Sequence, residues 1–269
     1  MEEKFKNELS KYIKEKTGYL EELEVANIFS KAGWGIRHSN YYLDKDEEKG
    51  REIDIFAYKS DLIKNNSPKE SISIHINLVC EVKKSTKKPW VIFSTKKSPS
   101  DNFFGLSIYY EKNMKNIIEK KIQWKVDRNS SIGSFKKIGE TYCEAFKDTK
   151  NNDSDYSQIF KSLTSSTKAS EYFLSIRKSN HLLNALCPNS IEFFEPIVVF
   201  KGQMFEAYLN KQDELQLNEI NHIPIIFNRI SPNYDRHDYL VDVVKVEELS
   251  NLLAEKEKWF NTIIEKIKE

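Results

Sequence analysis

Two short stretches of the sequence decide the fold that we expect, and both place charged residues among aliphatic ones. They read Arg51-Glu52-Ile53-Asp54-Ile55-Phe56-Ala57 and Leu78-Val79-Cys80-Glu81-Val82-Lys83-Lys84. Aliphatic and β-branched residues dominate both, which predicts two strands. Carboxylates in apolar strands carry a desolvation cost that folding alone does not require. Asp54 and Glu81 therefore indicate a functional site, most simply a metal site.

The connection between the two strands predicts how they pair. It contains Asn65-Asn66-Ser67-Pro68, a strong turn signal. If the strands fold back as an antiparallel hairpin about this Ser-Pro pair, Asp54 and Glu81 are equidistant from the turn and face each other. Strand alternation then puts Lys83 on the same face as Glu81. A bulge would shift this register by one residue.

A helix is expected before the strands, from about Tyr19 to Ala32, and Gly33 is its expected C-terminal cap. Most of its apolar residues fall on one face, and Glu22 lies near the centre of that face, whereas Glu21 and Glu24 point elsewhere. Glu22 is therefore a candidate member of the same site. The alternative is that its carboxylate extends to solvent at the end of the buried face.

Three carboxylates and one lysine in this arrangement favour a magnesium or manganese site. Hard oxygen ligands suit these ions, which keep several waters and bridge to phosphate oxygens. A nearby lysine could position or help to deprotonate an attacking water while it offsets charge in the transition state. Glu22, Asp54, Glu81 and Lys83 together outline a phosphodiesterase site.

The pattern resembles that of the PD-(D/E)xK nucleases, whose fold is called restriction-endonuclease-like. A helix glutamate, an aspartate on a strand and Glu-x-Lys on the next strand are matched by Glu22-Leu23-Glu24-Val25-Ala26, Glu52-Ile53-Asp54-Ile55 and Glu81-Val82-Lys83. The proline that names the family is absent, because Ile53 precedes Asp54. The motif covers about residues 18–88.

The resemblance also implies a role for each matched residue. Asp54, Glu81 and the Val82 carbonyl would bind Mg²⁺ or Mn²⁺. Lys83 would assist the nucleophilic water. Glu22 would hold the metal or its water shell.

The composition restricts how the protein could bind nucleic acid. The chain has 269 residues, of which 39% are hydrophobic and 31% charged, an ordinary globular balance. Its 42 lysines and arginines nearly cancel its 41 aspartates and glutamates, so no global positive field attracts a polyanion. Any surface that binds nucleic acid must therefore be local.

A lysine-rich segment follows the second strand and is the candidate for such a local surface. Lys84, Lys87 and Lys88 could track phosphates without reading sequence. The alternative is a solvated edge strand whose lysines discourage pairing with another chain. Trp90 and Phe93 in the same segment could stack on bases, but burial in a strand is the commoner outcome.

The remaining sequence predicts one α/β domain over residues 1–269: a restriction-endonuclease-like central mixed sheet flanked by helices. The core is expected at about 18–97, and strands and a helix at about 190–269 extend the same domain. The further strands are expected at 194–200, 204–209, 223–230 and 239–244, with Lys201-Gly202-Gln203 as a hairpin turn, and the further helices at 2–16, 112–125, 156–186 and 247–268. Residues 98–152 are the least legible and are expected to elaborate the core.

Our leading functional hypothesis is a Mg²⁺-dependent endonuclease that hydrolyses DNA phosphodiester bonds. The resemblance implies an effector of bacterial restriction or antiphage defence, with other subunits of a complex as partners and a homo-oligomer also compatible. The alternatives are a catalytically inactive nuclease-like scaffold and a nuclease that acts on RNA. The three cysteines lie far apart, and no leader peptide or apolar run of the ~20 residues that a membrane helix needs is visible. These features predict a cytoplasmic protein without a membrane partner.

Overall fold

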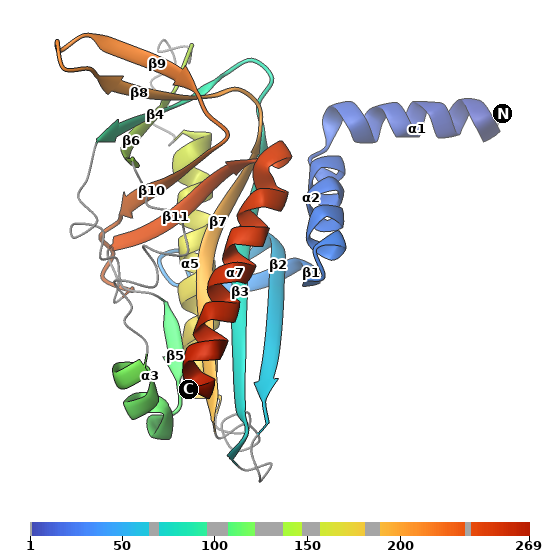
Figure 1. Ribbon diagram of the computed structural model, residues 1–269. Coiled ribbons are helices and arrows are strands. Elements are labelled where there is room, and N and C mark those ends of the chain that lie inside the picture. The colour runs from blue at the N-terminus through green and yellow to red at the C-terminus, as the bar shows by residue number, and fades with distance from the viewer. Residues whose placement is uncertain are drawn as a thin grey trace.

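In the computed structural model, residues 2–64, 70–95, 107–121, 137–146, 157–180, 189–234 and 238–269 are described. They form an α/β structure in which helices flank a large mixed sheet (Figure 1). The helices are α1 (Glu2–Lys16), α2 (Tyr19–Lys31), α3 (Lys115–Lys121), α5 (Gln158–Ser179) and α7 (Leu249–Lys268). Within these residues, no helix combines the length and the apolar character needed to cross a bilayer.

Eleven strands in the described residues join one sheet. They are β1 (Gly35–Asp44), β2 (Lys49–Ile63), β3 (Ile72–Lys84), β4 (Trp90–Thr95), β5 (Ile108–Tyr110), β6 (Ile138–Glu144), β7 (Ser190–Lys201), β8 (Met204–Leu209), β9 (Leu215–Glu219), β10 (His222–Asn228) and β11 (Asp238–Lys245). Their order is β1-β2-β3-β7-β11-β10-β6-β4-β8-β9, and β5 pairs with β7 outside this path. Strands from the N-terminal and C-terminal thirds of the chain therefore lie side by side.

The predicted hairpin register is confirmed. Strands β2 and β3 pair antiparallel from Ile55 opposite Cys80 to Ile63 opposite Ile72, so their symmetry point falls between residues 67 and 68. The turn itself, residues 65–69, lies outside the described residues. Strand β3 also pairs in parallel with β7 from Ser73 to Lys84, so both of its edges are hydrogen-bonded and it lies in the interior of the sheet.

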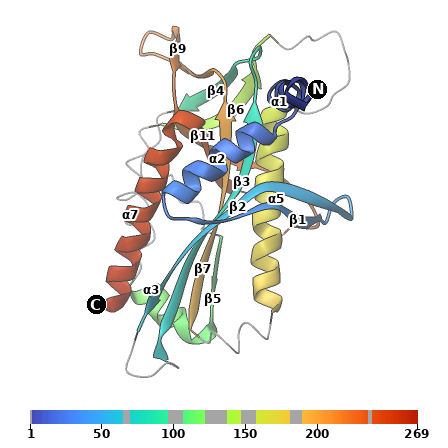
Figure 2. The same ribbon diagram turned by 90° about the vertical axis from the view of Figure 1, so that its right-hand side faces the viewer.

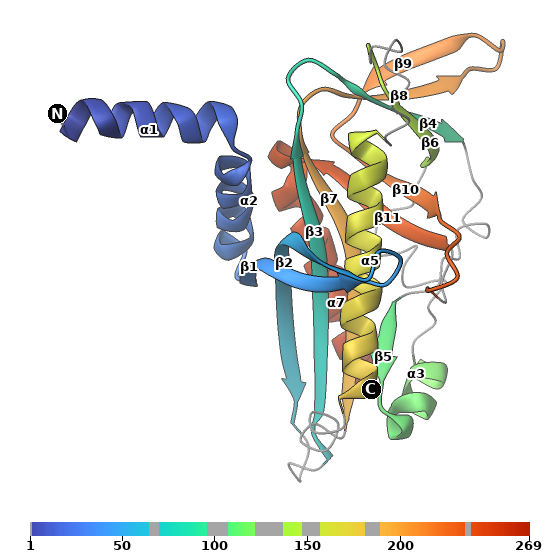
Figure 3. The ribbon, with the colours of Figure 1, turned by 180° about the vertical axis from the view of Figure 1, so that it is seen from behind.

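Alternation along the central strands divides the core between the two faces of the sheet. Ile55 and Ala57 pack with α2 and α7, whereas Phe56 packs with residues of α5. Figures 2 and 3 show α7 and α5 on opposite faces of β3 and β7. Asp54 and Glu81 alternate in step with Phe56 and Val79, so their side chains lie on the α5 face of β2 and β3.

Helix α2 ends as the sequence predicted. Gly33 has a φ of +75°, a conformation that costs glycine little. The Gly33 and Trp34 N–H groups donate to the carbonyls of Ser30 and Phe29, both at 3.0 Å, which is the Schellman pattern. This end fixes where the chain turns from α2 into β1.

Two expectations about the connections after β3 and β7 are wrong. Strand β4 is not an edge strand, because it lies between β6 and β8. The segment Lys201-Gly202-Gln203 is not a hairpin turn, because β8 pairs with β4 and β9 rather than with β7. The physical reason is that the segments after β3 and β7 stay side by side. Ser85 N–H donates to Lys201 O at 3.0 Å, and the two segments then pair again, in parallel, as β4 and β8.

Other boundaries differ from the predicted ones. Strands β5, β6 and β9 were not expected. Helix α3 is described only to Lys121, so the rest of the helix predicted at 112–125 lies outside the described residues. The helix predicted at 156–186 is described as α5, and residues 181–188 lie outside the described part.

Candidate active site

Asp54 stands where β2 separates from β3. The β2–β3 pairing stops at Ile55 and Cys80, whereas the pairing of β2 with β1 continues to Lys49. Beyond this fork no β2 backbone group meets Val82. Instead, the Asp54 side chain accepts a hydrogen bond from the Val82 N–H group, with 2.7 Å between Oδ2 and N. Asp54 thus occupies the fork and keeps a backbone donor satisfied there.

The Lys83 ammonium lies where three oxygen atoms converge. Its Nζ is 3.3 Å from Asp54 Oδ2, 2.5 Å from Glu81 Oε2 and 3.1 Å from the Val82 carbonyl oxygen. The expectation that Lys83 shares a face with Glu81 is confirmed by this contact. Two carboxylates and one carbonyl therefore surround a single positive charge, and the Asp54 and Lys83 side chains are still partly open to solvent, with 19% and 26% exposed.

Glu81 is the buried member of the site, with only 4% of the residue exposed. Burial and the nearby charge of Asp54 raise the pKa of Glu81 to about 7, although Lys83 and a hydrogen bond with Ser165 oppose the shift. Ser165 lies on α5 and also hydrogen-bonds Tyr42 of β1. Sequence reasoning missed Ser165 and Tyr42, because neither belongs to the segments that carry the motif.

Glu22 is half-buried on α2 and faces the site. Its pKa is raised, first by burial and then by the charge of Asp54, whereas Lys83 lowers it. Asp54 and Lys83 are therefore close enough to influence Glu22. This favours Glu22 as a member of the site over the alternative that its carboxylate extends to solvent. Within the described residues, however, no three His, Cys, Asp or Glu side chains are grouped closely enough to hold a metal ion by themselves.

Glu21 was expected to lie off the buried apolar face of α2, and this expectation is wrong. Glu21 is 2% exposed, and its Oε1 accepts from Lys84 Nζ at 2.6 Å, while Glu24 Oε2 pairs with Lys201 Nζ at 2.5 Å. Lys84 and Lys201 are direct neighbours at the ends of β3 and β7. Two glutamates three residues apart on α2 thus meet two lysines on adjacent strands. These pairs set the rotation of α2 and so the position of Glu22.

The predicted nucleic-acid contacts divide into two groups. Lys84 is engaged with Glu21, so its charge is largely compensated. Lys87 and Lys88 are exposed in the turn between β3 and β4, where no such pair is described for them. The expected burial of the strand aromatics is confirmed for Trp90, which is fully buried and stacks on Phe200, and is wrong for Phe93, which is 40% exposed. Lys87 and Lys88 are the members of the set that remain open to a phosphate backbone.

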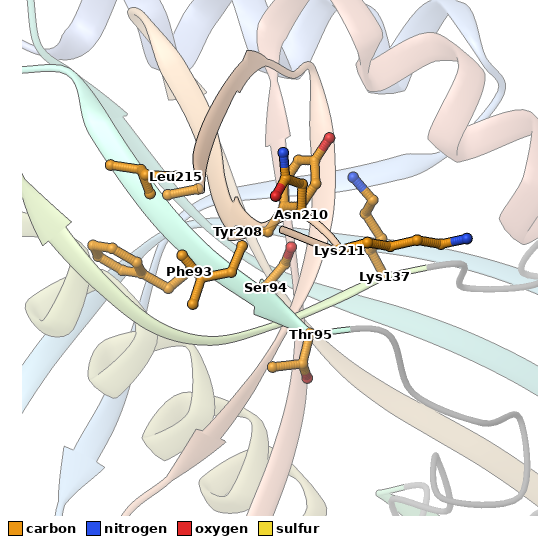
Figure 4. A pocket seen from close by; sticks show the side chains of 10 residues that line it. Phe93, Ser94, Thr95, Lys137, Tyr208, Asn210, Lys211 and Leu215 are labelled. Carbon is orange, nitrogen blue, oxygen red and sulfur yellow. The ribbon is translucent and has the colours of Figure 1, made fainter. Parts of the chain in front are cut away.

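A separate cavity of about 700 Å³ lies between β4 and the β8–β9 hairpin and includes none of the acidic site residues (Figure 4). Phe93 and Leu215 form one side, and Lys137 and Lys211 lie on the other. Lys137 is already paired with buried Glu206 at 2.6 Å and lies over the Tyr208 ring. This mainly apolar cavity offers no free carboxylate for hydrolytic chemistry.

No protein family model, curated protein or solved structure matches the chain. The chemical argument therefore depends on the geometry of the described residues. The donor set fits a hard divalent cation, because Asp54, Glu81 and the Val82 carbonyl present oxygen atoms alone and already converge on a positive charge.

The pKa of Glu81 predicts how stability depends on pH. Its folded pKa of about 7 exceeds the ordinary glutamate pKa of 4.5, so between these pH values the folded state holds a proton that the unfolded state has lost. The free energy of unfolding should therefore fall as pH rises through this window. Between pH 4.5 and 7 the free energy of unfolding of the wild type should fall by about 3 kcal/mol relative to that of Glu81→Gln. Urea denaturation of both proteins at a series of pH values measures this difference. Parallel pH profiles for the two proteins would contradict the shifted pKa.

Proposed function

We propose that this chain is a metal-dependent nuclease of the PD-(D/E)xK type, with a restriction-endonuclease-like fold and DNA as its substrate. The observation that carries the proposal is the meeting of Asp54, Glu81, Lys83 and the Val82 carbonyl around one positive charge. Three of these residues, Glu81, Val82 and Lys83, come from β3, and Asp54 comes from the point where β2 leaves it. Incidental surface charges would not require a buried carboxylate such as Glu81.

Asp54, Glu81 and the Val82 carbonyl are the groups that would hold Mg²⁺ or Mn²⁺, and Glu22 is placed to hold the ion or its water shell. When bound, the ion supplies Lewis-acid activation of the phosphate and of water. For this to happen, the Lys83 ammonium must leave the centre of the three oxygens. Lys83 can do so because a quarter of its side chain is open to solvent.

The charge state of Lys83 favours one of its two expected roles. Burial opposes its charged form, but the negative charges of Glu81 and Asp54 outweigh burial and raise the pKa of Lys83 above its ordinary value. Lys83 is therefore protonated at neutral pH and is not the base. We infer that it binds a phosphate oxygen and offsets the charge that develops there. Glu81, whose pKa is raised to about 7 by burial, would hold the ion only in its deprotonated form.

The nearly balanced net charge argues for local binding of the substrate. Exposed Lys87 and Lys88 lie four and five residues after Lys83 and would contact the nucleic-acid backbone near the scissile phosphate. A protein with nearly zero net charge has no strong long-range attraction to nucleic acid. This fits an effector that a partner or a defence complex brings to its target. The metal reads phosphate rather than sugar, so RNA is the second substrate to test.

Cleavage of closed circular plasmid tests the proposal most directly. We expect nicked and linear products with Mg²⁺ or Mn²⁺ and none with EDTA, because the carboxylates act on phosphate only with the ion. A closed circle has no ends, so these products also distinguish endonuclease from exonuclease action. Linear DNA and single-stranded RNA are assayed in parallel. Absence of metal-dependent cleavage of every substrate would overturn the proposed function.

A further inference from the structure

Helix α1 leaves the body of the protein and carries an uncovered apolar stripe. All three ribbon views show it projecting from the N-terminal end of α2, away from the sheet (Figures 1–3). Phe5, Leu9, Tyr12 and Ile13 have exposed fractions of 63%, 46%, 58% and 36%. Their helical spacing puts them on one face. The sequence predicted this amphipathic helix, but nothing in the described fold covers its apolar face, and a contiguous exposed apolar face marks an interaction site.

One edge of the stripe carries charges of alternating sign. Lys4, Glu8, Lys11 and Glu15 are spaced by four, three and four residues, which aligns them along one side of the helix. Within the part of the chain that the structure describes, none of the four forms an ion pair. By contrast, Lys6 on the other edge pairs with Glu2 at 2.9 Å. The four charges are therefore available to a partner.

The order of these charges specifies an antiparallel partner of the same sequence. Read from the opposite end, the row plus-minus-plus-minus becomes minus-plus-minus-plus. When two copies of α1 pack antiparallel through their apolar stripes, Glu8 of each lies opposite Lys11 of the other. Lys4 likewise lies opposite Glu15. We propose that two copies of this chain dimerise through α1 in this antiparallel arrangement.

Other occupants of the stripe fit less well. A parallel pair would set this edge against the opposite edge, where Lys6 is already paired with Glu2 and Ser10 is uncharged, so the row of alternating charges meets no complementary row. A helix that lies on an anionic membrane carries mainly lysine and arginine on its polar face. In α1, five lysines are interspersed with four glutamates, so its polar face is mixed. A second copy satisfies both the apolar stripe and its charged edge.

The dimer is tested with the full chain by light scattering after gel filtration and by sedimentation. An interface this small binds weakly, so we expect a dissociation constant on the order of 10 μM. The measured mass should rise with concentration from 31.6 kDa towards twice that value. A monomer at every concentration up to about 100 times that constant would overturn the proposal.

Charge-exchange variants test the antiparallel order. Glu8→Lys places lysine against Lys11 twice in the dimer and should weaken dimerisation at least about tenfold, as should Leu9→Glu in the centre of the stripe. The double variant Glu8→Lys/Lys11→Glu restores opposite charges and should recover dimerisation to within about threefold. Glu3→Lys, which makes the same charge change on the opposite side of the helix, is the matched control.

The outcomes separate the dimer from a general effect of charge. If Glu3→Lys weakens dimerisation as much as Glu8→Lys does, or if the double variant stays as weak as the single one, the antiparallel arrangement is wrong. Circular dichroism and thermal melting check that every variant keeps the helix and the fold. These measurements do not depend on nuclease activity, so the dimer can fail or hold independently of the proposed function.

Discussion

Replacing Asp54 by asparagine should lower the rate of metal-dependent cleavage at least about a thousandfold, equivalent to about 4 kcal/mol of transition-state stabilisation. The substitution keeps the size and shape of the side chain. Its amide oxygen can still accept the hydrogen bond from the Val82 N–H group, so the fork between β2 and β3 is preserved. The lost negative charge is the one that contacts Lys83 and that would bind the cation. The expected effect is therefore on chemistry rather than on folding.

The measurement is single-turnover cleavage of closed circular DNA with saturating enzyme and Mg²⁺, together with the melting temperature. Asp61→Asn is the matched control, because Asp61 lies on the same strand but is exposed, and its side chain accepts from the neighbouring Leu62 N–H group. It should cleave like the wild type. If Asp54→Asn retains cleavage within about tenfold of the wild type, Asp54 is not a member of the active centre.

The sequence predicts the centre of this site well because the information is local. The register that brings Asp54 to Glu81 follows from counting residues to one turn, and the structure has that register. Alternation along β3 then places Lys83. These steps need only strand geometry within one hairpin. No information from the rest of the chain is required.

The surroundings of the site could not be predicted, because distant segments decide them. The pattern of α2 identified Glu22 as facing inward but placed Glu21 off the apolar face. In the structure Glu21 pairs with Lys84, and Glu24 pairs with Lys201, a residue on a strand more than a hundred positions away. Ser165 likewise reaches Glu81 from α5. Helical periodicity sets a face only approximately, and the partner on the sheet selects the final rotation.

The sheet order shows the same limit. The turn at Gly202 has the composition of a hairpin turn, yet β7 and β8 do not pair. Their partners, β3 and β4, are earlier in the chain and separate at the same place, so two parallel pairings replace one hairpin. Short strands with few apolar residues were missed for a related reason. Strand β9 reads Leu215-Gln216-Leu217-Asn218-Glu219, and only its pairing with β8 makes it a strand.

Lys256 is a buried lysine that the sequence of the terminal helix already indicates. The terminal helix was predicted from its leucines, isoleucines and Phe260, but Lys256 is four residues before Phe260 and four after Leu252, in the middle of the apolar face. A lysine there needs buried partners. The strands provide them: Glu195 on β7 and Asp242 on β11 both contact Lys256 Nζ, the latter at 2.7 Å. This network joins α7 to the centre of the sheet.

Replacing Lys256 by methionine should therefore reduce the free energy of unfolding by about 3–5 kcal/mol. Lys256 is 1% exposed, and Glu195 and Asp242 are each 4% exposed. Methionine fills a similar volume but leaves two buried carboxylates without their cation. Burial raises the pKa of Asp242, but the charge of Lys256 and the hydrogen bond with His222 outweigh burial and hold it far below its ordinary value, so this carboxylate depends on these two neighbours. The melting temperature should fall by roughly 10 °C.

Urea denaturation and thermal melting measure this loss, with Lys258→Met as the matched control on the exposed side of the same helix. The control should change stability by less than about 0.5 kcal/mol. The triple variant Lys256→Met/Glu195→Gln/Asp242→Asn removes the uncompensated charges and should recover about 2 kcal/mol, because neutral amides cost less to bury than carboxylates. If the triple variant is no more stable than Lys256→Met, the loss comes from packing. Side-chain packing of Lys256 against the sheet, rather than its ion pairs, would then stabilise the position of α7.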